Sequence, residues 1–187
     1  MKFSKLTTLV AISAIILFPA AKARAVQLLD MQCVTTKPIN VRNYQEPEVF
    51  VKHRVPIDIF IGRENLPEIA YLRTFSSGAS GNRREGSQIV TDFPAEFSCR
   101  LTRSFQTLNL VFGLDDSLSN ERQLLELEVF AGNNLIANRR VAKGSVQSLS
   151  VNVTNARSLT IAARCVRKGG PLLNDCPLLS FVDMSLK

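Results

Sequence analysis

The stretch that decides the fold runs from Leu108 to Leu186 and opens with Leu108-Asn109-Leu110-Val111-Phe112-Gly113-Leu114-Asp115-Asp116. This opening is an apolar strand that ends in an acidic turn. Further short apolar runs follow at 125–130, 135–141, 149–153, 159–165 and 178–186. Segments that alternate between apolar and polar residues can bury one face of each strand and expose the other. The stretch therefore predicts an all-β protein built as a β-sandwich.

Similar strand signals occur earlier in the chain, at 26–34, 57–62, 69–75, 89–90 and 95–101. Between two of the later runs stands Gly132-Asn133-Asn134, which favours a hairpin because Gly and Asn accept positive φ. Hardly any segment keeps a helical period, and no linker or repeat divides the chain. We therefore expect one β-sandwich domain over residues 26–187, long enough to bury a sizeable core.

Residues 1–25 are typical of a cleaved export signal. Lys2 and Lys5 precede an apolar run from Leu6 to Phe18, and Ala23-Arg24-Ala25 offers small residues to a signal peptidase. The apolar run is shorter than the roughly 20 residues that a membrane-spanning helix needs. We expect cleavage before Val26, no stable membrane span afterwards, and a secreted or periplasmic mature protein.

The charge of the chain argues against nucleic acid as a partner. The sequence has 23 Lys and Arg against 16 Asp and Glu, a formal charge of +7. Residues 1–25 hold four basic residues and no acidic one, so the mature part has 19 against 16, or +3. The pairs Arg83-Arg84 and Arg139-Arg140 are far apart in the sequence. A nucleic-acid surface needs basic residues concentrated together with aromatics.

All four cysteines, Cys33, Cys99, Cys165 and Cys176, lie in the mature part. An even number in an exported chain predicts two disulfides and an oxidising compartment. Three pairings are possible. We favour Cys165 with Cys176, which would close a short loop, and Cys33 with Cys99, which would tie the first mature strand to the middle of the chain. A zinc site is the alternative, although the spacing lacks the two close pairs typical of four cysteine ligands.

A set of motifs from about Ala95 to Cys165 occurs in a characteristic order and spacing. The motifs are Glu96-Phe97-Ser98-Cys99-Arg100-Leu101, Phe105, Gly113-Leu114-Asp115-Asp116, the run 127–135, Lys143-Gly144 and the run 151–159. Together they resemble the NPCBM family, modules to which carbohydrate binding is attributed and which have the galactose-binding jelly-roll fold. The resemblance implies a jelly-roll β-sandwich and a carbohydrate or glycan partner.

The chain departs from that family in its aromatic residues. It contains no Trp, and Asn174-Asp175-Cys176-Pro177 stands where the family tends to have an Asp-His-Ala-Asp-Trp type segment. An aromatic face stacked on a sugar ring is a common means of recognition, because it buries apolar area at little entropic cost. Tyr44, Tyr71, Phe75 and Phe93 are candidates to replace the missing tryptophan.

Three polar loops, at 76–87, 115–123 and 167–175, are the candidates for ligand recognition, because loops can vary without unfolding a core. If they cluster, the predicted site contains Phe75, Arg83, Arg84, Asp115, Asp116, Arg167 and Asp175. Arginine donors suit sugar hydroxyls and the carboxylates of uronic acids. The loop 76–87 could equally be a plain solvated connection. Asp115 and Asp116 could bind calcium or could accept backbone N–H bonds within a turn.

No catalytic constellation is visible in the sequence. His53 is the only histidine, which excludes a multi-histidine metal site. Disulfide-bonded cysteines cannot act as nucleophiles. We therefore expect neither enzymatic activity nor a cofactor, with calcium as the one alternative. Two functions stay open: an exported non-catalytic module that binds carbohydrate, and an envelope protein that uses the same fold for protein–protein contacts.

Overall fold

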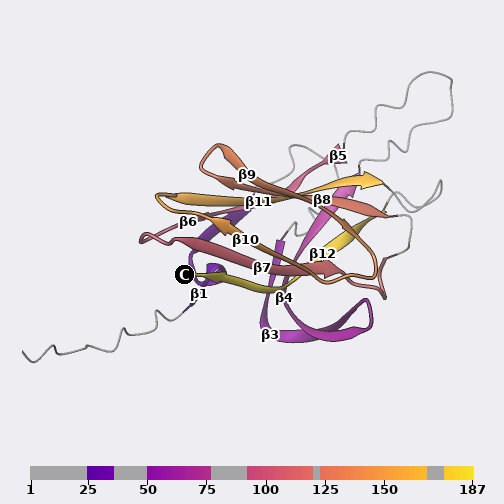
Figure 1. Cartoon of the computed structure of the whole chain (residues 1–187). Helices are drawn as coiled ribbons and strands as arrows, with labels where there is room; N and C mark the ends of the chain where they lie inside the picture. Colours follow the sequence, from indigo (N-terminus) through magenta and orange to yellow (C-terminus); the bar gives the residue numbers. More distant parts are fainter. Residues whose placement is uncertain (1–24, 36–49, 77–91, 120–122, 168–174) are drawn as a thin grey trace, which may run out of the picture.

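The computed structural model describes residues 25–35, 50–76, 92–119, 123–167 and 175–187, which form two antiparallel sheets packed face to face (Figure 1). Sheet A consists of β1 (Val26–Gln27), β3 (Phe50–Ile61), β4 (Glu64–Ser76), β5 (Asp92–Phe93), β7 (Thr107–Leu114), β10 (Gln147–Asn152) and β12 (Asp175–Leu186). Sheet B consists of β2 (Gln32–Thr35), β6 (Ala95–Arg100), β8 (Leu124–Ala131), β9 (Asn134–Ala142) and β11 (Ser158–Arg167). In the described residues the one helical element is a 3₁₀ turn, η1 (Leu28–Asp30). The predicted all-β sandwich is confirmed.

The strand order differs from the chain order in both sheets. Sheet A runs β10-β7-β12-β4-β3, with β1 paired to β12 and β5 paired to β4. Sheet B runs β2-β6-β11-β8-β9. Many consecutive strands therefore lie in opposite sheets, and the loops that join them cross the two ends of the sandwich.

The alternation read from the sequence is the alternation of burial in the structure. Leu125, Leu127 and Val129 of β8 are fully buried, while Glu126 and Glu128 between them keep partial exposure. The same holds for β10, where Leu149 and Val151 face the core, and for the apolar positions of β11. A period of two places alternate side chains on opposite faces of a strand.

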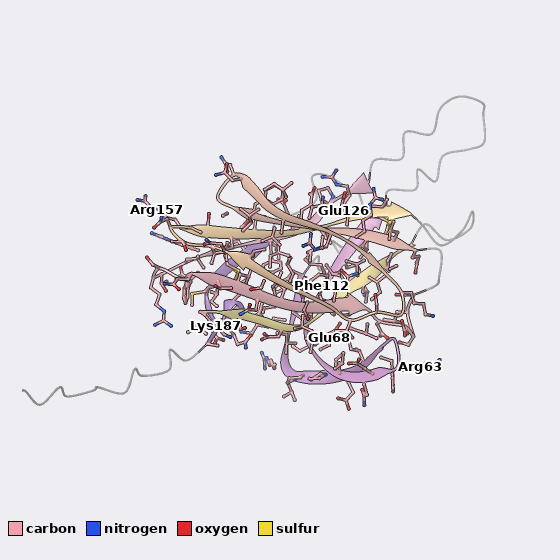
Figure 2. The ribbon with its side chains drawn as sticks, viewed as in Figure 1. Arg63, Glu68, Phe112, Glu126, Arg157 and Lys187 are labelled. Carbon is pink, nitrogen blue, oxygen red and sulfur yellow. A yellow bond between two sulfur atoms is a disulfide. The ribbon has the colours of Figure 1, made fainter. Side chains whose placement is uncertain are left out.

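Three phenylalanines join the two sheets at the centre of the core. Phe97 lies on sheet B, and Phe112 and Phe181 lie on sheet A; all three are fully buried, and Figure 2 labels Phe112. The rings of Phe97 and Phe181 meet edge to face, with 6.5 Å between their centroids. Edge-to-face packing adds about 0.5–1.5 kcal/mol to the free energy gained by burying the rings.

The first strands differ from their predicted ranges. The run 26–34 is interrupted by η1, whose Leu28 and Leu29 turn into the core. The strands β3 and β4 are longer than the predicted 57–62 and 69–75. Pro56 lies in the register shift of β3, and Pro67 lies in a part of β4 that pairs with the edge strand β3. Pro is tolerated at the edge of a sheet and in bulges. The predicted strand 89–90 lies outside the described residues.

The hairpin of β3 and β4 folds back over the outer face of sheet A, below β7 and β12 in Figure 1. The register shifts between Lys52 and Ile57, so that several residues of β3 bulge against one of β4. Beyond this bulge, Ile61 is fully buried although it lies outside the main core cluster. It packs beside Gly113, at a position of β7 that faces away from the core.

The predicted disulfide pairing is confirmed. Cys33 and Cys99 are direct register partners on β2 and β6, and their sulfurs are bonded. Cys165 at the end of β11 is bonded to Cys176 at the start of β12, and no free cysteine remains. The first bridge lies within sheet B, whereas the second joins sheet B to sheet A.

Candidate functional site

The strand ends that flank the three predicted loops lie at one end of the sandwich, which we call the Asp115 end. Phe75 near the end of β4 pairs with Asp175 at the start of β12, and Arg167 at the end of β11 pairs with Leu124 at the start of β8. The end of β7 lies beside the same part of β12. These strand ends are on the right of Figure 1.

Asp115 and Asp116 begin the described part of the loop after β7. Asp115 is 6% exposed, and its carboxylate accepts hydrogen bonds from the backbone N–H and the hydroxyl of Ser117, at 3.0 and 2.8–2.9 Å. Asp116 Oδ1 accepts the N–H of Gly144 at 3.2 Å. Both carboxylates therefore have partners within the protein, in the manner of turn residues.

The other members of the predicted site are described only in part. Phe75, Arg167 and Asp175 are placed by their backbone pairing alone. Arg83 and Arg84 lie outside the described residues, as does most of the loop 76–87. The structure thus places at one end the strand positions of Phe75, Asp115, Arg167 and Asp175. A shared binding site formed by their side chains stays a prediction.

An exposed aromatic residue that the sequence reasoning missed lies close to this loop. Phe60 of β3 is 54% exposed, and its carbonyl oxygen accepts the backbone N–H of Asp116 at 2.7 Å. Of the aromatic side chains whose burial is described, it is the exposed one. Its alternation with the buried Ile59 and Ile61 is a signal that the sequence contained, since Phe60 occupies the opposite face of the strand.

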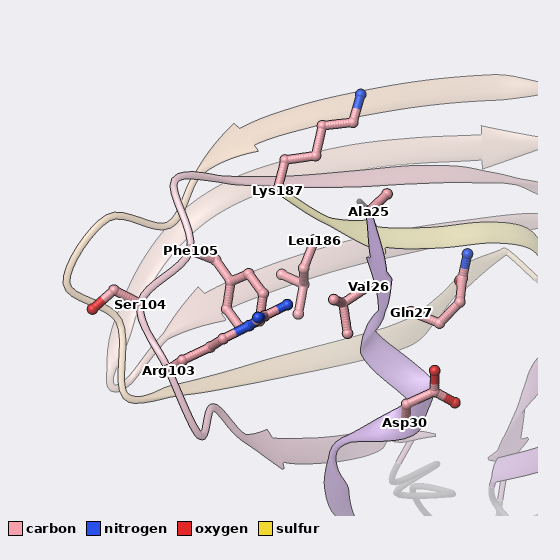
Figure 3. A pocket seen from close by; sticks show the side chains of 9 residues that line it. All are labelled: Ala25, Val26, Gln27, Asp30, Arg103, Ser104, Phe105, Leu186 and Lys187. Carbon is pink, nitrogen blue, oxygen red and sulfur yellow. The ribbon is translucent and has the colours of Figure 1, made fainter. Parts of the chain in front are cut away.

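The opposite end of the sandwich, which we call the Arg103 end, contains two neighbouring hollows. The larger, about 770 Å³, lies between β1, the end of β12 and the loop after β6 (Figure 3). The smaller, about 340 Å³, lies between residues 101–104 and 155–157. Arg103 and Ser104 line both hollows. Of the predicted site residues that the structure describes, none lines either hollow.

Within the described residues, no group of three His, Cys, Asp or Glu side chains could hold a metal ion. His53 Nε2 lies 2.7 Å from Oε2 of Glu68, which is 3% exposed. The single histidine thus contacts a buried carboxylate, at the register shift of β3. None of the helical residues in the described ranges builds a helix of the length and hydropathy that crossing a bilayer requires.

The fold is similar to the β-sandwich of solved carbohydrate-binding modules. The CBM51 module of Clostridium perfringens GH95, solved in complex with methyl-galactose, has 13% sequence identity and a TM-score of 0.57 over 88% of this chain and 100% of that one. The CBM51-2 and INT domains of Clostridium perfringens ZmpB, solved with GlcNAc, have 11% identity and a TM-score of 0.59 over 87% of this chain.

This chain spans 31% of that ZmpB chain and the full length of the GH95 module. No protein-family model matches the sequence, and no curated protein does. The likeness at 11–13% identity therefore shows a shared fold. The β-sandwich fold that the sequence predicted is confirmed, while the galactose-binding-like assignment and membership of the NPCBM family stay predictions.

Proposed function

We propose that this chain is an exported, non-catalytic module that binds carbohydrate. The observation that carries the proposal is the shared fold with the GH95 module, a structure that is itself a binding module in complex with methyl-galactose and matches over its whole length. The two disulfides fit an oxidising compartment, which supports export.

The proposed binding surface is the Asp115 end. There, exposed Phe60 offers an apolar face beside the polar loop that begins at Asp115. Its described residues, 115–119, are held in place, because Lys143 Nζ donates to the carbonyl oxygen of Ser119 at 3.0 Å and Asp116 Oδ1 accepts the N–H of Gly144. A segment that is positioned in advance lowers the entropic cost of binding. The predicted contacts from Phe75, Arg83, Arg84, Arg167 and Asp175 would complete this surface.

The proposal is tested by a glycan array on the mature protein, followed by titration of the strongest ligand against variants. Substituting Arg83 and Arg84 with Ala should weaken binding about tenfold, because hydrogen bonds from a charged donor are lost. Phe60→Ala should weaken it to a similar degree. The matched control, R139A/R140A on β9, removes the same charge from sheet B and should bind normally. Thermal midpoints should stay close to that of the parent chain.

Unchanged affinity in R83A/R84A would remove these arginines from the site. Unchanged affinity in both that variant and F60A would overturn the Asp115 end as the binding surface. An array on which nothing binds would contradict the proposed function itself.

The second candidate, an envelope protein that binds a protein partner, is favoured by the exposed apolar residues of β3. Val55, Ile57 and Phe60 are 74%, 47% and 54% exposed on the edge strand of sheet A. An edge strand with apolar side chains can pair with another chain. Two results together would favour this candidate. One is a glycan array on which nothing binds, and the other is an envelope protein that cross-links to the parent chain and does not cross-link to Ile57→Glu.

A further inference from the structure

The two hollows at the Arg103 end rest on loops that are bonded to each other. The loop 101–106 joins β6 to β7, and the loop 153–157 joins β10 to β11. Leu101 N donates to the carbonyl oxygen of Arg157 at 2.9 Å, and Val153 N donates to that of Gln106 at 2.9 Å. These two backbone hydrogen bonds, one at each side of the pair of loops, fix the relative position of the loops, as a preformed site requires.

Two arginines line the smaller hollow. Arg103 and Arg157 are both exposed at its rim, and Thr102 and Asn155 add neutral polar groups. Among the described residues, no carboxylate lies within ion-pair distance of either guanidinium. This hollow therefore presents two cationic donor groups to solvent, where a carboxylate of a ligand can be bound by paired N–H bonds.

Arg103 is held in a defined position by the ring beneath it. Its guanidinium carbon lies 5.0 Å from the centroid of Phe105, a cation–π contact, and Figure 3 shows the side chain extended along that ring. Phe105 itself is 6% exposed, so the arginine forms the surface between the two hollows. An arginine placed in advance loses less conformational entropy when it binds a ligand.

The larger hollow adds space beside these cations. Val26, Leu186 and Phe105 form its apolar wall, Asp30 and Gln27 add polar groups, and Ala25, which precedes the predicted cleavage point, lies at its edge. A volume of about 770 Å³ falls within the range of roughly 300–1,000 Å³ that small-molecule sites have. The mixture of apolar surface, amide and carboxylate suits a sugar ring, which has an apolar face and hydroxyls at its rim.

We propose that the Arg103 end is a second binding site, independent of the Asp115 end, that takes an acidic sugar chain. The carboxylate of one hexuronic acid lies between Arg103 and Arg157, and the neighbouring ring of the chain occupies the larger hollow. The two hollows share Arg103 and Ser104, so two consecutive sugar units reach both of them.

The test is a calorimetric titration of the full mature chain with tetragalacturonic acid, using a neutral tetrasaccharide of galactose as the comparison. The parent chain should bind the acid more tightly. R103Q/R157Q should weaken binding of the acid at least about tenfold, because two charge-assisted contacts are lost. R139Q/R140Q is the matched control: it removes the same two charges from β9, away from both hollows, and should retain binding.

Backbone amide shifts of the parent chain, followed by NMR during the titration, locate the ligand without any substitution. The largest changes should occur at Ser104 and Asn155. Equal losses in R103Q/R157Q and R139Q/R140Q would show long-range charge attraction and overturn the site. So would shifts confined to the Asp115 end, or absence of binding by the parent chain. Displacement by inorganic phosphate as effective as that by galacturonic acid would overturn the assignment to a sugar.

Discussion

At the scale of single residues, the lack of a side chain at Gly113 allows the β3–β4 hairpin to cover the outer face of sheet A. A Cβ added to Gly113 would lie 2.6 Å from Cγ2 of Ile61, 3.0 Å from its Cδ1 and 3.1 Å from the carbonyl oxygen of Ser145. Gly62, in the turn of the same hairpin, has a φ of +67° and leaves 2.8 Å between such a Cβ and the carbonyl oxygen of Gly144. Both glycines permit close approach of the β3–β4 hairpin.

Gly113→Ala should lower the free energy of unfolding by about 1–3 kcal/mol, as overpacking does in well-packed interiors. In the background of Ile61→Ala the same substitution should cost less, since the atoms that it meets are largely removed. Urea unfolding of the two single variants and the double variant measures this coupling. Additive losses would show that Gly113 and Ile61 do not compete for the same space.

At the scale of elements, the two disulfides act on different parts of the sandwich. The bridge from Cys33 to Cys99 ties β2 to β6 across a sequence separation of 66 residues. The bridge from Cys165 to Cys176 has a separation of 11 residues and connects the two sheets at the Asp115 end. Closing a longer loop removes more entropy from the unfolded chain.

Replacing Cys33 and Cys99 with Ala should therefore destabilise the protein by about 4 kcal/mol, and replacing Cys165 and Cys176 with Ala by about 3 kcal/mol. Denaturant unfolding of each double variant under oxidising conditions provides the comparison, with the oxidised parent chain as the common reference. A larger loss from the short bridge would show that its connection between the sheets outweighs loop entropy.

At the scale of the whole molecule, the start of the described chain is part of the fold. Val26 pairs with Leu186 and Gln27 with Ser185, so the first strand after the predicted cleavage point lies against the last strand of sheet A. The next residues, Leu28 and Leu29, are buried in the core. Cleavage before Val26 would thus remove residues that precede the first strand and leave its pairing in place.

Intact-mass measurement of exported protein should give a chain that begins at Val26. The substitutions A23L and A25L together should block processing, because a signal peptidase requires small residues at these positions. A mass that retains residues 1–25 in the parent chain would contradict the predicted cleavage, and unchanged processing in the variant would contradict its position.

The sequence by itself determined the fold class and the strand positions from Ala95 onward, because burial on one face of a strand imposes a period of two that is visible locally. It favoured the cysteine pairing that the structure shows, out of three that were possible. It also indicated Asp115 and Asp116 as turn residues. The 3₁₀ turn at Leu28–Asp30 and the bulge between Lys52 and Ile57 were not predicted, since both satisfy tertiary packing rather than local propensity.

Only the tertiary structure decided which residues share an end of the sandwich. Arg103 and Arg157 are 54 positions apart in the sequence, yet they line one hollow. They do so because the end of β6 pairs with the start of β11, and the end of β10 pairs with the start of β7. Phe60 likewise reaches the loop of Asp116 only because the β3–β4 hairpin folds back over sheet A. Such proximity follows from strand order and register, which long-range pairing sets and local sequence pattern does not encode.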